Sequence, residues 1–284
     1  MQAGQVWFPD SAYKTAQAIQ DFNAGEGLPL LLLANWRGFS GGRKDMFEEV
    51  LKFGSFIVDQ LTQFNQPIMV YIPPHCEIRG GAWVVIDSTI NPSCMEMYAA
   101  EHSRGGVLEP AGIAEIKFRK PEIIKATHPT TGHIVDFIRS YHLHYLTHHP
   151  MQVMHRTDKQ LQWMSMNEAN NVVRPEDLAA RESELLPFYQ PLGELFSDLH
   201  DRPERMLAKG VIRKIVQWKD SRSFFYWRLK RRLGEMAAVK ALRAADPSLG
   251  EGEAMAEVQS KLPAHVLDDD RQAVEFLASA MPID

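Results

Sequence analysis

The sequence of 284 residues has little cysteine, no long hydrophobic run and, in its first residues, no basic-then-apolar pattern, and each feature argues against a class of protein. With only Cys76 and Cys94, disulfides cannot be the main fastening of the fold, and a reducing compartment is favoured. The longest leucine-rich run, 28–34, is far shorter than the ~20 residues that span a bilayer. We therefore expect a soluble cytoplasmic protein without a membrane span, with plastid and mitochondrion left open.

The composition is that of a globular protein, with 45% hydrophobic and 24% charged residues. The net charge of −5 is unevenly spread. Residues 202–243 hold thirteen Lys or Arg against three acidic residues, whereas 244–284 hold nine acidic residues against two basic ones. Neighbouring segments of opposite sign more often pair with each other than bind nucleic acid, so no nucleic-acid partner is expected.

The chain divides into three regions that differ in sequence pattern. Residues 1–125 hold short apolar runs separated by glycine and proline, which indicates an α/β core. Residues 126–172 hold seven of the eleven histidines and little periodicity, so we interpret them as a variable insertion. Residues 173–284 are interpreted as a helical part of the same domain, with helices over 182–199, 203–218, 222–244 and 269–280.

The core contains a strand–helix–strand unit. Continuous apolar runs at 30–33, 68–72 and 83–86 predict strands buried on both faces. Between the first two runs, apolar residues recur at spacings of three and four over 44–64, which predicts an amphipathic helix. Gly54 lies on the apolar face of that helix, where it permits close packing or close approach of a ligand.

The sharpest motif is the glycine-rich stretch 34–42, between a predicted strand and a predicted helix. Ligands of α/β sheets gather at this point, where glycines let backbone N–H groups approach them. The stretch also matches Gly-x-Ser-x-Gly with Ser40 at the nucleophile position. A serine hydrolase is therefore a rival hypothesis, with His102 or His200 and Asp87 as partners.

Other polar candidates are scattered along the core. Gly80 and Gly81 precede the apolar run 83–86, where their amides could stabilise an oxyanion. Glu109 stands in a loop, and Lys117 and Arg119 alternate with apolar residues, as on one face of a strand. The histidines of the insertion lack acidic or Cys partners at ligand spacing, so no metal site is predicted; they are His142, His144, His148, His149 and His155.

Many blocks of the chain together resemble the carboxyltransferase domain of eukaryotic-type multidomain acetyl-CoA carboxylase. The blocks are 35–42 (NWRGFSGG), 71–74 (YIPP), 79–87 (RGGAWVVID), 96–99 (EMYA), 106–110 (GVLEP), 198–201 (DLHD), 206–212 (MLAKGVI) and 225–229 (FYWRL). The resemblance covers 4–125 and 180–243, and is weak at 126–172 and over the last 40 residues. It implies the second half of a carboxyltransferase, a crotonase-like ββα superhelix with a helical C-terminal extension.

The resemblance implies transfer of CO2 from carboxybiotin to acetyl-CoA, which gives malonyl-CoA for fatty-acid synthesis. Backbone donors stabilise the enolates of such a reaction, which explains why glycines fill the motifs. By the same resemblance, Arg37 would hold the transferred carboxylate, and Gly80 and Gly81 would serve the enolate oxygen. The implied biotin pocket consists of Phe39, Gly41, Gly42, Gly54, Val84 and Glu109. Lys117 and Arg119 would meet coenzyme A.

The resemblance also implies several partners. Much of the coenzyme A site would belong to an upstream half, biotin would be carried on another domain, and ATP would be used only by a domain absent here. The active site would lie between two subunits of a head-to-tail homodimer. The sequence contains no Met-Lys-Met biotin attachment site, so we expect a fragment of a larger enzyme. A non-catalytic fragment is the other alternative.

Overall fold

The computed structural model describes residues 4–117, 158–168, 170 and 172–280, which form two compact units. The first unit joins Met1–Gly105 with Met206–Asp284, and the second is Gly106–Arg205. Each unit is described by itself.

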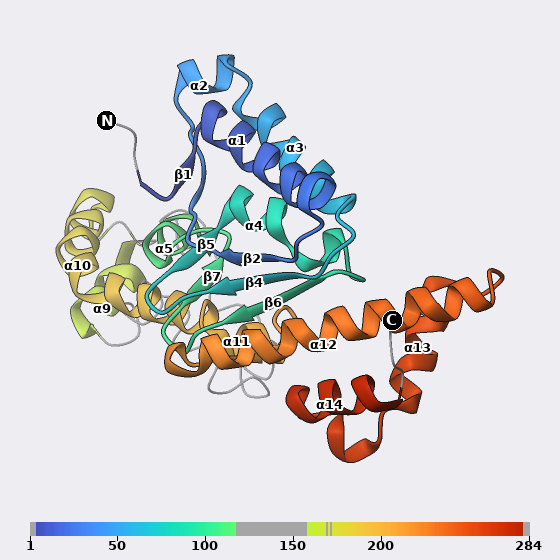
Figure 1. Cartoon of the computed structure of the whole chain (residues 1–284). Helices are drawn as coiled ribbons and strands as arrows, with labels where there is room; N and C mark the ends of the chain where they lie inside the picture. Colours follow the sequence, from blue (N-terminus) through green and yellow to red (C-terminus); the bar gives the residue numbers. More distant parts are fainter. Residues whose placement is uncertain (1–3, 118–157, 169, 171, 281–284) are drawn as a thin grey trace. The chain divides into compact units, whose positions relative to one another are not determined.

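A parallel sheet forms the centre of the first unit (Figure 1). Its order is β2 (Leu30–Leu33), β4 (Ile68–Ile72), β6 (Met95–Ala99) and β8 (Lys214–Ile215). The strands predicted at 30–33 and 68–72 are confirmed, and every residue of β4 is buried. In β2, however, Leu31 is 46% and Leu33 52% exposed, because the described part of the chain only partly covers the face that these two side chains share at this edge strand. Burial on both faces was wrong for β2.

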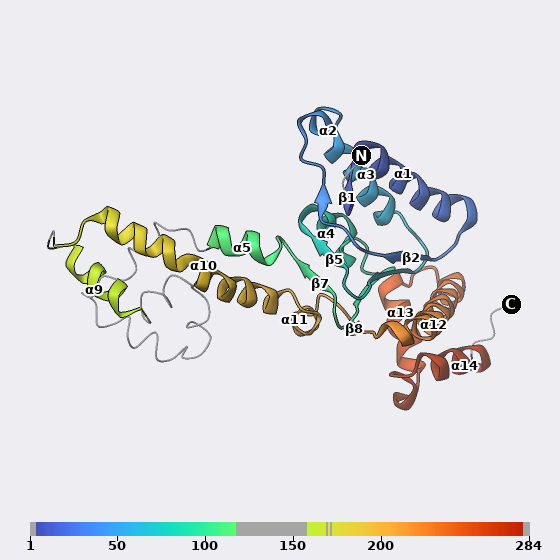
Figure 2. The ribbon, with the colours of Figure 1, turned by 90° about the vertical axis from the view of Figure 1, so that its left-hand side faces the viewer.

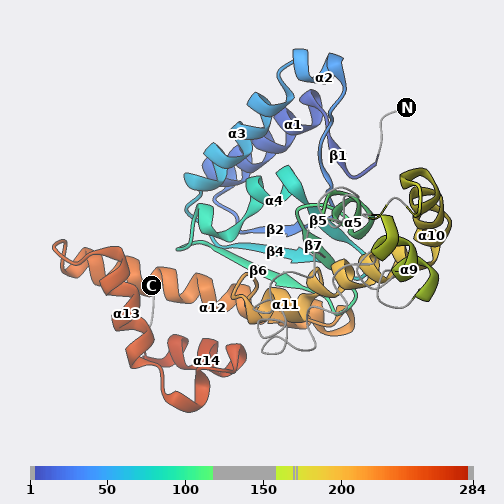
Figure 3. The ribbon, with the colours of Figure 1, turned by 180° about the vertical axis from the view of Figure 1, so that it is seen from behind.

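Two helices cover one face of the sheet (Figures 1 and 3). They are α1 (Pro9–Gln20) and α3 (Val50–Thr62), which contact each other and bury small and branched side chains against the strands. The helix predicted over 44–64 is confirmed for α3 but broken before it. The short α2 (Arg43–Phe47) ends ahead of Glu49, whose φ of 63° is left-handed and redirects the chain.

The run 83–86 is a helix, α4 (Gly80–Ile86), and the strand predicted there was wrong. The strand lies just before it, as β5 (Glu77–Arg79), which pairs with β7 (Arg104–Gly106). Gly80 then turns the chain with a φ of 48°, a conformation that glycine adopts without a steric penalty. A second short pair joins β1 (Val6–Trp7) to β3 (Gly38–Phe39) in parallel.

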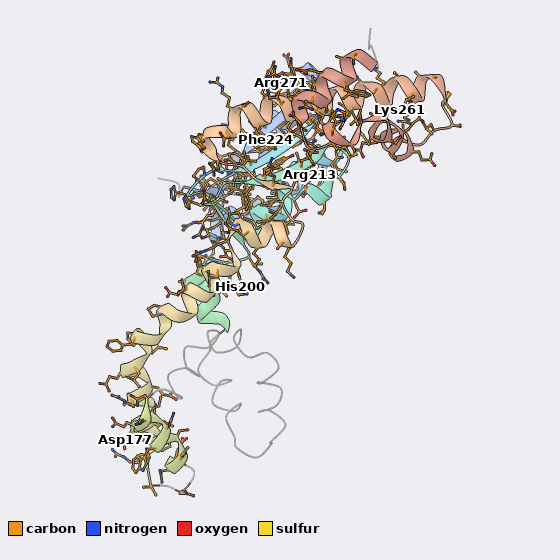
Figure 4. The ribbon with its side chains drawn as sticks, turned by 90° about the horizontal axis from the view of Figure 1, so that it is seen from below. Asp177, His200, Arg213, Phe224, Lys261 and Arg271 are labelled. Carbon is orange, nitrogen blue, oxygen red and sulfur yellow. The ribbon has the colours of Figure 1, made fainter. Side chains whose placement is uncertain are left out.

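The long helix α12 (Trp218–Ala245) packs on the opposite face of the sheet, as Figure 1 shows. Phe225 of this helix lies in one buried cluster with Tyr71 of β4 and Tyr98 of β6. The chain then folds back through α13 (Glu251–Lys261) and α14 (Asp270–Ala280), both of which contact α12. Figure 4 labels Phe224 of α12 and Arg271 of α14 in this region. The helices predicted over 222–244 and 269–280 are confirmed.

The helix predicted over 203–218 was wrong in its second half. Only α11 (Pro203–Ala208) is helical, and Gly210, with a φ of 71°, ends it. The chain then forms β8, whose residues 214 and 215 pair with 98 and 99 of β6. A two-residue strand leaves no periodic signal in the sequence, so only its distant partner reveals it.

The second unit is helical in the part that the structure describes (Figure 2). It contains α5 (Pro110–Lys117), α9 (Lys159–Glu168) and α10 (Pro175–His200), and α10 contacts both other helices. Asp177 and His200 lie toward opposite ends of α10 (Figure 4). Lys117 ends a helix, so the strand predicted around it was wrong there. None of the described helices combines the length and apolar character needed to cross a bilayer.

Candidate functional site

The glycine-rich stretch follows the C-terminal end of β2 and is fastened to β5. Asn35 accepts hydrogen bonds through its Oδ1 from Gln5 Nε2 at 2.6 Å and from the Glu77 N–H at 3.1 Å. The backbone N–H of Trp36 donates to the Glu77 carbonyl at 2.9 Å, and the N–H of Arg79 donates to the Trp36 carbonyl at 2.9 Å. These bonds hold the Arg37 loop beside the strand that leads into α4.

Arg37 projects from this loop with 55% of its side chain exposed. Its Nε donates to Glu77 Oε1 at 2.5 Å, while the buried Arg79 donates through its Nε to Glu77 Oε2 at 2.8 Å. Burial alone would raise the pKa of the Glu77 carboxyl, but the hydrogen bonds and charges of Arg79 and Arg37 outweigh it and lower this pKa. The site therefore presents one fixed, half-exposed cation.

Phe39 lies between two of the predicted glycines. A Cβ at Gly54 would come within 2.6 Å of the Phe39 ring, and a Cβ at Gly81 within 3.0 Å of it. Gly54 packs closely against Phe39, and the position of this ring requires glycine at both places. The structure brings Phe39, Gly54 and Gly81 together from three separate segments of the sequence.

The first turn of α4 carries the predicted amide donors. Gly80 and Gly81 open the helix, and the first N–H groups of a helix have no intrahelical acceptor. They are therefore suited to an anion or a developing oxyanion. Val84, one turn further along, is 68% exposed, so it adds an apolar surface to a donor-rich edge.

Ser40 does not stand in the arrangement of a hydrolase nucleophile. Its Oγ hydrogen-bonds the carboxylate of Asp45. It also lies 3.4 Å from the N–H of Gly42, the N-cap of α2. The serine of a nucleophile elbow sits in a strained turn with a positive φ, and Ser40 does not have a positive φ.

The proposed hydrolase partners have other contacts. Both carboxylate oxygens of Asp87 accept hydrogen bonds, from Thr89 and from Trp83 Nε1 at 2.7 Å. The His102 ring stacks on His75 with centroids 5.6 Å apart. His200 belongs to the second unit. The triad inferred from the sequence is therefore not assembled in the described contacts.

The remaining predicted residues have different surroundings. Gly41 and Gly42 are exposed in the turn before α2. Glu109 is exposed just before α5 of the second unit, and Lys117 is the last residue of α5. Arg119 lies outside the described residues.

Sequence reasoning missed Glu77, although a signal was present. Glu77 and Arg79 are two residues apart on a strand, so their side chains share one face. The stacking of Trp7 on Trp36, with ring centroids 4.6 Å apart, was also missed, because β1 and the loop after β2 are distant in sequence.

A second polar cluster lies between β6 and α12. Glu96 is 1% exposed and accepts hydrogen bonds from Arg228 at 2.6 and 2.8 Å and from the Tyr98 hydroxyl at 2.7 Å. Burial alone would raise the pKa of Glu96, but the hydrogen bonds and charges of Arg228, with Arg213 and Tyr98, lower it to about 2. Because Glu96 is so fully paired, we interpret the cluster as structural.

In the same region, the basic segment 202–243 forms ion pairs with the acidic segment that follows it. Asp270 of the acidic tail pairs with Arg228 at 3.0 Å and with Arg231 at 3.1 Å. Within α12, Arg231 and Arg232 both pair with the buried Glu235. The expectation that the basic and acidic segments pair with each other is confirmed for these residues.

Among the described residues, no group of three or more His, Cys, Asp or Glu side chains could hold a metal ion. The five histidines considered in the insertion, all within 142–155, lie outside the described residues.

The comparisons with known proteins agree with the fold. The family described as "Carboxyl transferase domain" matches residues 1–233, and the chain belongs to this family. The curated relatives it matches are acetyl-CoA carboxylases: 53% identical over 248 residues in Dictyostelium discoideum, and 48% identical over 283 residues in a Saccharomyces cerevisiae protein named "Acetyl-CoA carboxylase, mitochondrial". The matches cover 87% and 97% of this chain but only 10% and 11% of the relatives.

The solved structure of transcarboxylase 12S, with methylmalonyl-coenzyme A and methylmalonic acid bound, has a similar fold. The TM-score is 0.50 at 13% sequence identity, over 78% of this chain and 31% of that one. At this identity the likeness concerns the fold alone. The crotonase-like α/β fold expected from the sequence is confirmed, as is the resemblance to the carboxyltransferase part of acetyl-CoA carboxylase.

Proposed function

We propose that the chain is the second half of an acetyl-CoA carboxylase carboxyltransferase, which moves a carboxyl group from biotin to acetyl-CoA and forms malonyl-CoA for fatty-acid synthesis. The observation that carries this proposal is the joining of a half-exposed Arg37 to the glycine amides at the start of α4 through one hydrogen-bonded loop. A cation for a carboxylate and amides for an enolate oxygen are what this reaction needs.

The roles follow from what each group offers. Arg37 holds the carboxylate, and the amides of Gly80 and Gly81 donate to the enolate oxygen of the thioester. When bound, biotin would supply the carboxyl group. Its uncharged bicyclic ring system, with a planar ureido ring, is suited to the aromatic and glycine surfaces near Phe39 and the exposed Val84. The resemblance assigns the rest of the biotin pocket to Gly41, Gly42 and Gly54. Glu109 for biotin, and Lys117 and Arg119 for coenzyme A, are assigned by the resemblance alone.

The face of the sheet on which α12 packs supports the proposal that further polypeptide completes the carboxyltransferase. A groove of about 510 Å³ runs between Leu31 and Leu33 of β2 and Trp218, Phe225 and Tyr226 of α12. Parallel sheets are nearly always covered on both faces, and the residues that the structure describes leave this apolar strip open. We assign its cover to the upstream carboxyltransferase half, which the much longer relatives have room to contain.

The other partners belong to the same proposal. They are acetyl-CoA, a biotinyl carrier domain, a domain that uses ATP and a second subunit arranged head to tail. The proposed compartment is the cytoplasm. One yeast relative is named mitochondrial, so fractionation of cells that express the tagged protein decides between the two.

The test is malonyl-CoA decarboxylation with free biotin, measured for the 284-residue chain alone and together with the upstream half of a related carboxylase. We expect feeble turnover alone and recovery with the added half. Robust turnover by the chain alone would contradict this division of labour, and no turnover in either case would favour a non-catalytic fragment.

The hydrolase alternative has its own test. Ser40→Ala should keep substantial decarboxylation activity in the combined enzyme, because Ser40 bonds Asp45 beside α2. The wild type should also not react with a fluorophosphonate probe. Loss of all turnover with an intact fold, together with labelling at Ser40, would support the hydrolase.

A further inference from the structure

Glu77 occupies the point where the two proposed catalytic segments meet. Its two carboxylate oxygens are divided between Arg37 at 2.5 Å and Arg79 at 2.8 Å. Its backbone N–H and carbonyl bond Asn35 and Trp36. One residue thereby fixes both the main chain of the Arg37 loop and the side chain of Arg37.

The geometry leaves the outer end of Arg37 available. Glu77 takes the Nε–H, and the described part of the chain places no other hydrogen-bond acceptor on this guanidinium. The two terminal nitrogens can therefore pair side by side with a second carboxylate, which is the strongest arrangement a guanidinium offers.

The two arginines that pair with Glu77 differ in burial: Arg79 is buried and Arg37 is half exposed. Arg79 is 3% exposed in its side chain, so it is a rigid counter-charge that keeps Glu77 ionised and in place. Arg37 is 55% exposed and would sample many rotamers without a partner. Glu77, whose side chain is 14% exposed, is held in place by Arg79 and in turn restricts the rotamers of Arg37.

We infer that Glu77 is a positioning residue, which orients the Arg37 guanidinium toward the carboxylate being transferred and holds it at a fixed distance from the amides of Gly80 and Gly81. This role rests on the proposed function of Arg37. Glu77 itself touches neither the substrate nor the reacting atoms; it acts through Arg37.

The first experiment uses the 284-residue chain and does not depend on activity. Arginine side-chain ¹H–¹⁵N spectra should contain a shifted, slowly exchanging Nε–H signal, assigned to Arg37 by its loss in Arg37→Lys. Glu77→Gln should return this signal toward the exposed-arginine position, while Glu77→Asp should restore it in part. Glu49→Gln is the matched control, because it breaks an exposed pair with Lys52 at 2.9 Å and should leave the signal unchanged.

The second experiment measures malonyl-CoA decarboxylation in the enzyme completed by the upstream half. Glu77→Gln should lower kcat/KM roughly tenfold or more. Glu77→Asp should recover part of the loss, and Glu49→Gln should match the wild type. A merely structural role would instead lower the amount of folded enzyme without this graded recovery.

The outcomes separate the inference from the proposed function. If Arg37→Ala abolishes turnover but Glu77→Gln leaves both the spectrum and kcat/KM unchanged, the role of Glu77 is wrong and the proposed function stands. If Arg37→Ala leaves turnover unchanged, the assignment of Arg37 fails first, whatever the spectrum of Glu77→Gln shows.

Discussion

Two regions of the first unit use charged residues in opposite ways. At the glycine-rich edge, Arg37 is half exposed and keeps part of its guanidinium unpaired. Beneath α12, Glu96 is buried and surrounded by Arg228, Arg232 and Tyr98. The difference has a physical reason: water can solvate the donors of an exposed guanidinium until a ligand binds, whereas a buried charge is costly unless it is paired, as Glu96 is. The pairing is incomplete only at Arg232 Nε, which lies 3.5 Å from Glu96 Oε1 and has no hydrogen bond among the described contacts.

The largest effect is expected from Glu96→Ala, because it would leave buried guanidinium groups without their counter-charge. Breaking one partner of a buried ion pair costs about 3–5 kcal/mol of unfolding free energy. Urea denaturation measures it. Glu101→Ala, at an exposed position beyond the same strand, is the control and should change stability by less than about 0.5 kcal/mol. Equal stability of both variants would show that the cluster contributes nothing.

Acid should weaken the buried cluster around Glu96. The pKa of Glu96 is about 2 in the folded chain and 4.5 ordinarily, so its contribution is fully present above pH 4.5 and lost as pH falls toward 2. The loss is on the order of 3 kcal/mol. Between pH 4.5 and 2, the free energy of unfolding obtained from urea denaturation should fall more steeply with decreasing pH for the wild type than for Glu96→Gln. Identical acid dependence would contradict the low pKa.

At the site, Arg37→Ala should lower turnover without lowering stability. Loss of a charge-assisted contact to the carboxylate costs about 100-fold in kcat/KM, while the exposed pair with Glu77 contributes little to folding. Arg37→Lys should also fail, because an ammonium cannot pair with two oxygens in one plane. Decarboxylation kinetics and urea midpoints of the completed enzyme check both statements. Unchanged kcat/KM in both variants would remove Arg37 from the site.

The smallest effect is expected from Gly54→Ala. The new Cβ would lie 2.6 Å from the Phe39 ring, so the ring must move, at a cost of about 1–3 kcal/mol that the better helix propensity of alanine partly offsets. Gly252→Ala, in α13 with open space around it, should be neutral or slightly stabilising. Thermal unfolding of both variants makes the comparison. Equal effects would mean that Phe39 is not fixed against Gly54.

The sequence predicted most of the elements that have a long or periodic local pattern. The apolar runs 30–33 and 68–72 and the periodic residues of α3 all formed the expected elements. The run 83–86 failed because a short buried helix and a short buried strand have the same apolar texture, and β5 ended one residue before Gly80. The glycines after β2 and β5 could be singled out because glycine at a strand end is itself a local signal; their role in a site stays a prediction.

The sequence by itself determined the family and the glycine-rich motif that contains Arg37, because both depend on residue types at fixed spacing. Only the tertiary structure decided that Phe39 lies between Gly54 and Gly81 and that Glu77 joins Arg37 to Arg79. It also decided that Glu96 meets Arg228, 132 residues further along the chain. Such contacts bring together segments that no local periodicity connects, so their energies exist only once the sheet and its helices have assembled.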